Sequence, residues 1–112
     1  MLCLLLSCNP PAEKADYNSL STGLLSSCNE MLTDAIVGDL FTPPAASRIY
    51  AYSNVAFYMA LLLAYPGYAT YSGQLNGMPA MPPPAEGMEY DYSASAAFAF
   101  TEWLKNSSSA SR

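Results

Sequence analysis

The chain has 112 residues, of which 52% are apolar and only 12% are charged, and its net charge is −5. It contains no histidine, which excludes imidazole catalysis and histidine–metal bonds. The few basic residues are scattered, so no cationic patch exists to bind nucleic acid, and we expect no nucleic-acid partner. The high apolar fraction indicates that a partner or a further part of the protein covers part of the surface. The basic residues are Lys14, Arg48, Lys105 and Arg112.

The N-terminus resembles a bacterial lipoprotein signal. An apolar run at 2–6 leads into Ser7 and Cys8, and a small residue before the cysteine is what the lipoprotein signal peptidase requires. The run lacks a basic start and is shorter than the usual ~7–15 residues. We predict a signal-like segment over 1–8, a tether over 9–16 and lipidation at Cys8. The alternative is an apolar terminus that packs on the rest of the chain.

A first helix is predicted from Asp16 or Asn18, either of which can act as an N-cap. Apolar residues recur at helical spacing, which indicates one buried face and places Asn29 and Thr33 on the exposed side. Cys28 lies on the apolar face, which favours a small buried hydrophobic residue over a reactive nucleophile. The apolar positions are Leu20, Leu24, Leu25, Cys28, Met31, Leu32, Ala35 and Ile36.

A hinge follows near Gly38, where Thr42 is a candidate cap and Pro43 suits the first position of the next helix. Two antiparallel helices about this hinge form a hairpin. We expect Asp39 and Arg48 to face each other across it, because they lie equally far from its midpoint.

The second helix is predicted from Pro44 to about Tyr65 and is apolar on every side. Such a helix is buried in a larger protein or in a bilayer. Ser53, Asn54 and the interspersed tyrosines favour a core helix over a transmembrane span.

Glycine and proline residues punctuate the segment from Pro66 to Glu89, which predicts a long irregular loop. A third helix begins at Asp91 or Ser93 and runs towards Trp103. The segment after this helix, 105–112, is serine-rich, and we expect it to be a disordered or out-of-frame tail. The partial helical domain is therefore predicted to span 17–104.

Three carboxylates, Glu86, Glu89 and Asp91, cluster at the end of this loop. Oxygen-rich loops suit hard cations, so this is a candidate cation site. No established ligand spacing is present, which favours the alternative, a solvated acidic turn.

The run PPAASRIYAY at 43–52, the YSGQLNG segment at 71–77 and the helix at 90–100 resemble the N-terminal helical region of bacterial vanadium-dependent haloperoxidases. These enzymes are relatives of the type 2 phosphatidic acid phosphatases, and the resemblance covers roughly residues 15–103. It implies an exported helical protein whose intact form binds vanadate or hydrolyses phosphate esters. The family's Lys, Arg, Ser-Gly-His and axial His motifs are missing here, so we expect no catalytic, cofactor-binding or metal-binding residue in this chain.

The predicted fold is therefore all-α: an N-terminal helical hairpin plus a third helix of a larger helical bundle. The predicted function is that of an inactive N-terminal fragment of a haloperoxidase-like or phosphatase-like protein, cut before the catalytic motifs. Its partner is the rest of the bundle or another apolar surface, and its location is the bacterial cell envelope, lipid-anchored on the periplasmic or outer-membrane side. The alternative is a small, complete, lipid-anchored helical protein that docks on a partner or on the membrane.

Overall fold

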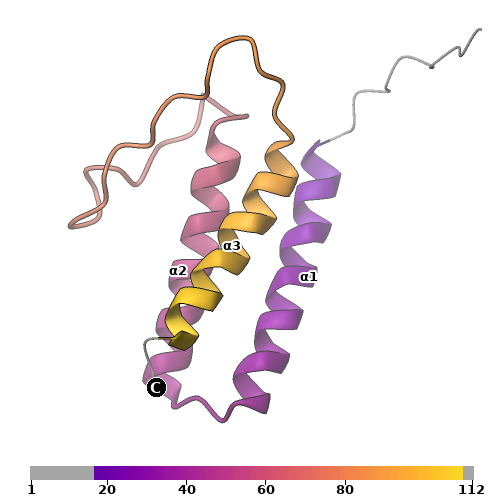
Figure 1. The fold of residues 1–112 in the computed structure, drawn as a ribbon, viewed down its shortest axis with the longest axis vertical. Coiled ribbons are helices and arrows are strands. Elements are labelled where there is room, and N and C mark those ends of the chain that lie inside the picture. Colours follow the sequence, from indigo (N-terminus) through magenta and orange to yellow (C-terminus); the bar gives the residue numbers. More distant parts are fainter. Residues whose placement is uncertain (1–16, 110–112) are drawn as a thin grey trace, which may run out of the picture.

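The computed structural model describes residues 17–109, with side chains over 22–106. It contains α1 (Tyr17–Gly38), α2 (Pro43–Leu62) and α3 (Tyr92–Ser109). The chain runs down α1, returns along α2 and runs down again along α3, so that consecutive helices are antiparallel, while α1 and α3 run parallel (Figure 1). No strand occurs within 17–109, which confirms the all-α prediction.

A short turn joins α1 to α2 and explains where the second helix begins. Thr42 adopts an extended conformation and Pro43 occupies the first helical position, as predicted. The main-chain carbonyl of Thr42 accepts the first helical bond from the Ala46 N–H at 2.9 Å. The Thr42 hydroxyl makes no capping hydrogen bond, so the proline and not the hydroxyl sets this helix start.

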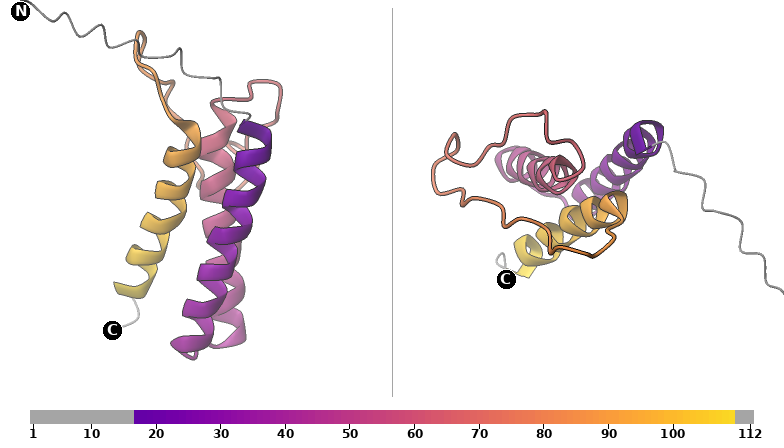
Figure 2. Two further views of the ribbon diagram at one scale, coloured as in Figure 1. Left: turned by 90° about the vertical axis from the view of Figure 1, so that its right-hand side faces the viewer. Right: turned by 90° about the horizontal axis from the view of Figure 1, so that it is seen from above.

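The third helix holds the bundle together. It packs mainly against α2, and α1 contacts α3 more extensively than it contacts α2. The views in Figure 2 show that the three axes do not lie in one plane. All three helices contribute to one apolar core, whose buried members are Cys28, Leu32, Ile36, Ile49, Phe57, Ala96 and Phe100.

Aromatic pairs fix the contact between α2 and α3. The rings of Phe57 and Phe100 meet edge to face, with centroids 6.4 Å apart and planes at 88°. Nearer the start of α2, Tyr52 stacks on Trp103 at 4.8 Å. Such pairs contribute about 0.5–1.5 kcal/mol beyond the area they bury. The predicted role of α2 as a core helix agrees with this, because it packs on both neighbours.

The contact between α1 and α2 is polar along one line. The side-chain amides of Asn29 and Asn54 exchange hydrogen bonds of 3.0 and 2.9 Å, and the hydroxyls of Thr33 and Tyr50 lie 2.6 Å apart. Asn29, which was expected on the exposed side, is instead half-buried in this contact, whereas Thr33 is exposed as expected. Met31, expected on the buried face, is 68% exposed. The buried line of α1 is narrower than predicted.

The predicted ion pair between Asp39 and Arg48 is not formed. Both residues are exposed, and no ion pair within 4.0 Å joins them. The two hydrogen-bonded pairs between α1 and α2 are symmetric about the peptide bond between Phe41 and Thr42. Asp39 and Arg48 would need the symmetry point two residues later, between the prolines. The helices are therefore offset from the register that this ion pair requires.

The long segment between α2 and α3 is irregular, as predicted, and its first half packs on α2. The Tyr58 hydroxyl donates to the carbonyl of Ala69 at 2.6 Å, and the Thr70 hydroxyl contacts the Met59 sulfur at 3.8 Å. These contacts hold the loop against the helix that precedes it. The proline run at 82–84 is exposed.

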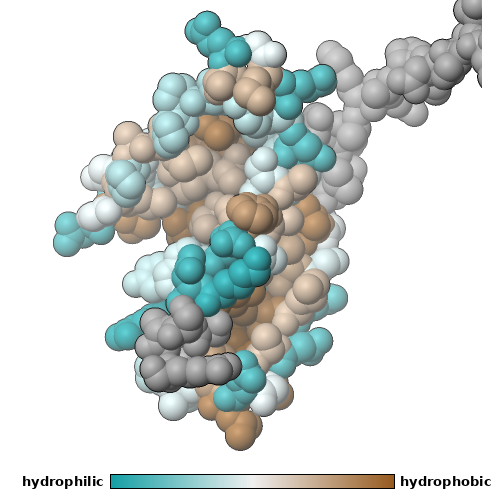
Figure 3. All heavy atoms as spheres, in the orientation of Figure 1, coloured by the Kyte–Doolittle hydropathy of each residue, from teal (hydrophilic) through white to brown (hydrophobic). Residues whose placement is uncertain are grey.

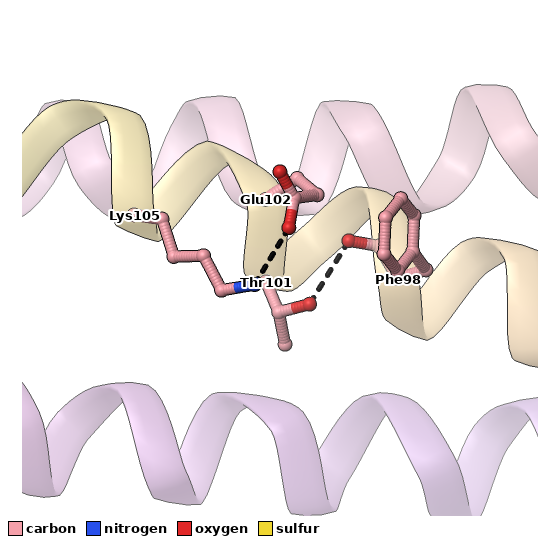
Figure 4. A network of polar contacts seen from close by, with 4 residues as sticks. All are labelled: Phe98, Thr101, Glu102 and Lys105. Carbon is pink, nitrogen blue, oxygen red and sulfur yellow. Dashed lines mark hydrogen bonds and ion pairs between the residues drawn. The ribbon is translucent and has the colours of Figure 1, made fainter.

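Asp91 caps α3, which confirms it as one of the two predicted starts. Its carboxylate accepts a hydrogen bond from the Ala94 N–H at 3.0 Å. The helix continues to Ser109, so the tail expected from residue 105 is helical at least that far. An ion pair of 2.7 Å between Lys105 and Glu102, one turn apart, supports this last part (Figure 4). Residues 110–112 lie outside the described part.

None of α1, α2 and α3 combines the length and the hydropathy needed to cross a membrane.

Candidate docking site

The end of α1 is closed by a main-chain turn that normally carries glycine. The N–H of Phe41 donates to the carbonyl of Ile36 at 3.2 Å, and the N–H of Leu40 donates to that of Val37 at 3.3 Å. This is the hydrogen-bond pattern of a Schellman motif, in which the residue after the helix adopts a left-handed conformation. That position belongs to Leu40, whose φ is 54°. Gly38, two residues earlier, does not occupy it.

Leu40 combines two unfavourable features. A left-handed conformation costs a side-chain-bearing residue roughly 1–2 kcal/mol because its Cβ crowds the following carbonyl oxygen. The same side chain is 87% exposed to solvent, more than any other exposed large apolar residue in the described part. It therefore gains little from burial within this chain. A strained backbone that presents an apolar side chain outward is typical of a functional position.

A cleft of about 250 Å³ opens beside this turn, where the end of α1, the start of α2 and the last turns of α3 meet. Its walls are mostly apolar, and one acidic and one basic side chain lie at its margin. The lining residues are Leu32, Ala35, Ile36, Asp39, Phe41, Ile49, Leu104 and Lys105. Apolar walls with few polar groups suit an apolar side chain better than an ion.

The exposed surface around the cleft is also apolar. Val37, on the last turn of α1, is 67% exposed, and Leu40 follows three residues later. Figure 3 shows apolar residues at the lower end of the molecule, over the turn between α1 and α2. We call the cleft together with Val37 and Leu40 the hinge surface.

The candidate cation site is not assembled, and the favoured interpretation was a solvated acidic turn. Glu86, Glu89 and Asp91 are exposed, and the Asp91 carboxylate caps α3. Within the described residues, no group of three or more cysteine or acidic side chains is placed to hold a metal ion. The solvated acidic turn is the better description.

Cys8, the predicted lipidation site, lies outside the described residues, as do the other residues of 1–16.

Cys28 is buried in the core, as predicted for a small hydrophobic residue. Burial penalises the thiolate and raises the pKa of this thiol above its ordinary value of 9.0. A raised pKa lowers the fraction of nucleophilic thiolate at neutral pH, so Cys28 is unsuited to nucleophilic chemistry.

Comparison with protein-family models, with curated proteins and with solved structures gave no match. The hinge surface must therefore be interpreted from its own geometry. The first helix was predicted to end near Gly38, as observed, but no conformation was assigned to Leu40. One signal was available in the sequence: 39–44 contains no glycine or asparagine. A bulkier residue must therefore adopt the left-handed conformation that ends the helix.

Proposed function

We propose that this chain is a helical docking element that packs on the catalytic part of a vanadium-dependent haloperoxidase-like or phosphatase-like protein. The hinge surface would be the contact, and the exposed, left-handed Leu40 is the observation that carries the proposal. A partner that buries this side chain recovers about 1.5–3 kcal/mol of apolar transfer free energy, which offsets the strain.

The shape of the hinge surface supports an apolar helical partner. Leu40 projects from the turn, and the cleft beside it has the volume to accept side chains in return. In a helical bundle, a protruding side chain of one helix fits into a hollow between side chains of its neighbour. The hinge surface offers both a protruding side chain and a hollow. The rim charges at Asp39 and Lys105 would then lie at the solvent-exposed edge of the contact.

The chain itself supplies no oxyanion site in this proposal. It has no histidine, and its basic residues lie far apart in the sequence. Vanadate or phosphate would be held by the partner. This chain would contribute packing and no catalytic residue.

The family part of the proposal is tested on the genomic DNA that follows these codons. We expect one reading frame to encode Pro-Ser-Gly-His and then an arginine with a second histidine. Absence of these motifs from all three frames would refute the family relation.

The docking part is tested by titrating that downstream polypeptide, produced separately, into this chain while following Trp103 fluorescence. We expect Leu40→Gly to weaken binding, although it relieves the strained backbone. Leu75→Ala, which alters an exposed leucine in the loop between α2 and α3, is the matched control and should bind normally. Equal affinity of the wild type and Leu40→Gly would show that the hinge surface is not the contact.

A lipid anchor is the second part of the proposal and rests on the sequence around Cys8. Lipidation there would hold the protein in the cell envelope, with 9–16 as the tether. If the chain is instead a complete lipid-anchored protein, the hinge surface would dock on another partner or on the membrane. Acylated Cys8 in cells, together with vesicle binding by the unacylated chain that Leu40→Gly abolishes, would favour this alternative.

A further inference from the structure

A turn in the loop between α2 and α3 contains the pair Asn76 and Gly77, the only asparagine–glycine pair in the chain. Both residues are exposed. Gly77 has φ +77°, and a Cβ built on it would meet nothing within 4 Å. The main chain around this pair is therefore uncrowded and open to water.

The hydrogen bonding of Asn76 differs from that of the asparagines between α1 and α2. The amide nitrogens of Asn29 and Asn54 each donate to the other side chain and to a carbonyl one turn earlier in their own helix. In the described part of the chain, neither the Asn76 amide nor the Gly77 N–H makes a hydrogen bond. Nothing holds either of these two groups in place.

We propose that Asn76 is a site of spontaneous deamidation, with water as the only co-reactant. The Gly77 main-chain nitrogen attacks the Asn76 side-chain carbonyl carbon and gives up its proton to solvent. The carbon–nitrogen bond of the side-chain amide breaks, and ammonia leaves after taking up a proton. Water then opens the resulting cyclic imide at either carbonyl, which gives aspartate or isoaspartate at position 76.

The absence of a side chain at Gly77 favours the attacking step. A Cβ would crowd the approach of the nitrogen to the side-chain carbonyl, and asparagine is among the chemically labile residues of proteins. Asn29 and Asn54 are followed by Glu30 and Val55 inside helices. There the following N–H is committed to the helix, so these two sites are protected.

The product would change this turn in two ways. A new carboxylate adds one negative charge, from −5 to −6 for the whole chain. Isoaspartate also lengthens the main chain by one carbon inside a turn that is closed by the Ser72 hydroxyl, which donates to the Pro79 carbonyl at 2.9 Å. The lengthened chain would loosen this closure, so deamidation would act on both the charge and the geometry of the loop.

The experiment follows the purified full chain in mildly alkaline buffer by peptide mapping and mass spectrometry, with isoaspartyl methyltransferase labelling. We expect deamidation and label at Asn76, with Asn29 and Asn54 unchanged over the same period. Asn76→Gln should abolish the label and the shift to a more acidic isoelectric point. Comparable rates at Asn29, Asn54 and Asn76, or no product at Asn76, would overturn the proposal.

A second measurement tests the structural reason. Because Asn76 is already exposed and unbonded, its rate in the native chain should be close to its rate in urea. A large acceleration on unfolding would mean that the native turn protects the site, contrary to the proposal.

Discussion

Asn29 on α1 and Asn54 on α2 exchange two hydrogen bonds, each side chain acting as both donor and acceptor for the other. The second hydrogen of each amide goes to a carbonyl of its own helix, Leu25 and Tyr50 respectively. Both amides thus use all their donors, and the pair is satisfied only in one register of the two helices. It specifies how the hairpin aligns.

The first prediction is a double-mutant cycle on this pair. We expect Asn29→Ala and Asn54→Ala each to destabilise the chain, because the remaining half-buried amide loses its partner. The coupling between them should be about 0.5–1.5 kcal/mol in urea unfolding. The Asp39 and Arg48 pair provides the matched control, since no ion pair joins them. Zero coupling between the asparagines would show that they do not set the register.

The second prediction concerns a buried hydroxyl. Ser53 is fully buried in α2, and among the described residues its hydroxyl has no hydrogen-bond partner. A buried polar group without a partner costs about 1–3 kcal/mol, so Ser53→Ala should raise the free energy of unfolding by about 1 kcal/mol or more.

Alanine also has a higher helix propensity than serine. The control must therefore separate this propensity from the removal of the buried hydroxyl. Ser26→Ala changes an exposed serine of α1 and reports the helix preference alone, roughly 0.5 kcal/mol. If both variants gain the same stability, burial of the Ser53 hydroxyl carries no cost.

The third prediction follows from the raised pKa of Cys28. In a background with Cys3→Ser and Cys8→Ser, the native thiol should react slowly with a disulfide reagent and quickly in urea. The pKa of Cys28 is higher in the folded chain than in the unfolded chain. At a pH between these two pKa values, the folded chain keeps the thiol proton and the unfolded chain has lost it. Stability should be pH-independent below about pH 9, as far as this group decides it, and fall as pH rises through the folded-state pKa.

Unfolding curves at several pH values check this, with Cys28→Ala as the reference. The difference between the two proteins should shrink or reverse only on the alkaline side. A thiol equally reactive in the native and unfolded chains would contradict its burial.

The helices were predictable because each depends on local signals. The 3.6-residue periodicity located α1, Pro43 fixed the start of α2, and Asp91 capped α3. The register was not predictable, because it depends on how far each helix is rotated about its axis. Symmetry about the prolines suggested the wrong pairing, and polar side chains such as Asn29 were assigned to water when they bond across the helices. The candidate site was missed for a different reason, because the conformation of Leu40 depends on the turn as a whole.

The fourth prediction concerns catalysis. The purified chain should neither brominate a dye with vanadate, bromide and peroxide nor hydrolyse p-nitrophenyl phosphate. It has no histidine, and no cluster of basic residues is available to stabilise a tetrahedral oxyanion. A boiled sample serves as the control. Turnover above that control would place chemistry in this chain and refute its role as a docking element.

The last prediction separates the strain at Leu40 from its proposed use. Leu40→Gly should stabilise the isolated chain by about 1 kcal/mol, because glycine adopts the left-handed conformation without a Cβ clash, although it also gains freedom in the unfolded state. Leu40→Asn should stabilise it less, since asparagine tolerates this conformation better than leucine but not as well as glycine.

Val37→Ala is the control, because Val37 is nearly as apolar and exposed but lies within α1. It should change stability only by the small difference in helix preference, roughly 0.5 kcal/mol. Urea unfolding of the three variants gives the comparison. A loss of stability in Leu40→Gly would mean that the leucine side chain is held by contacts within this chain. It would then have no surplus apolar surface to offer a partner, and the hinge surface would lose its main support.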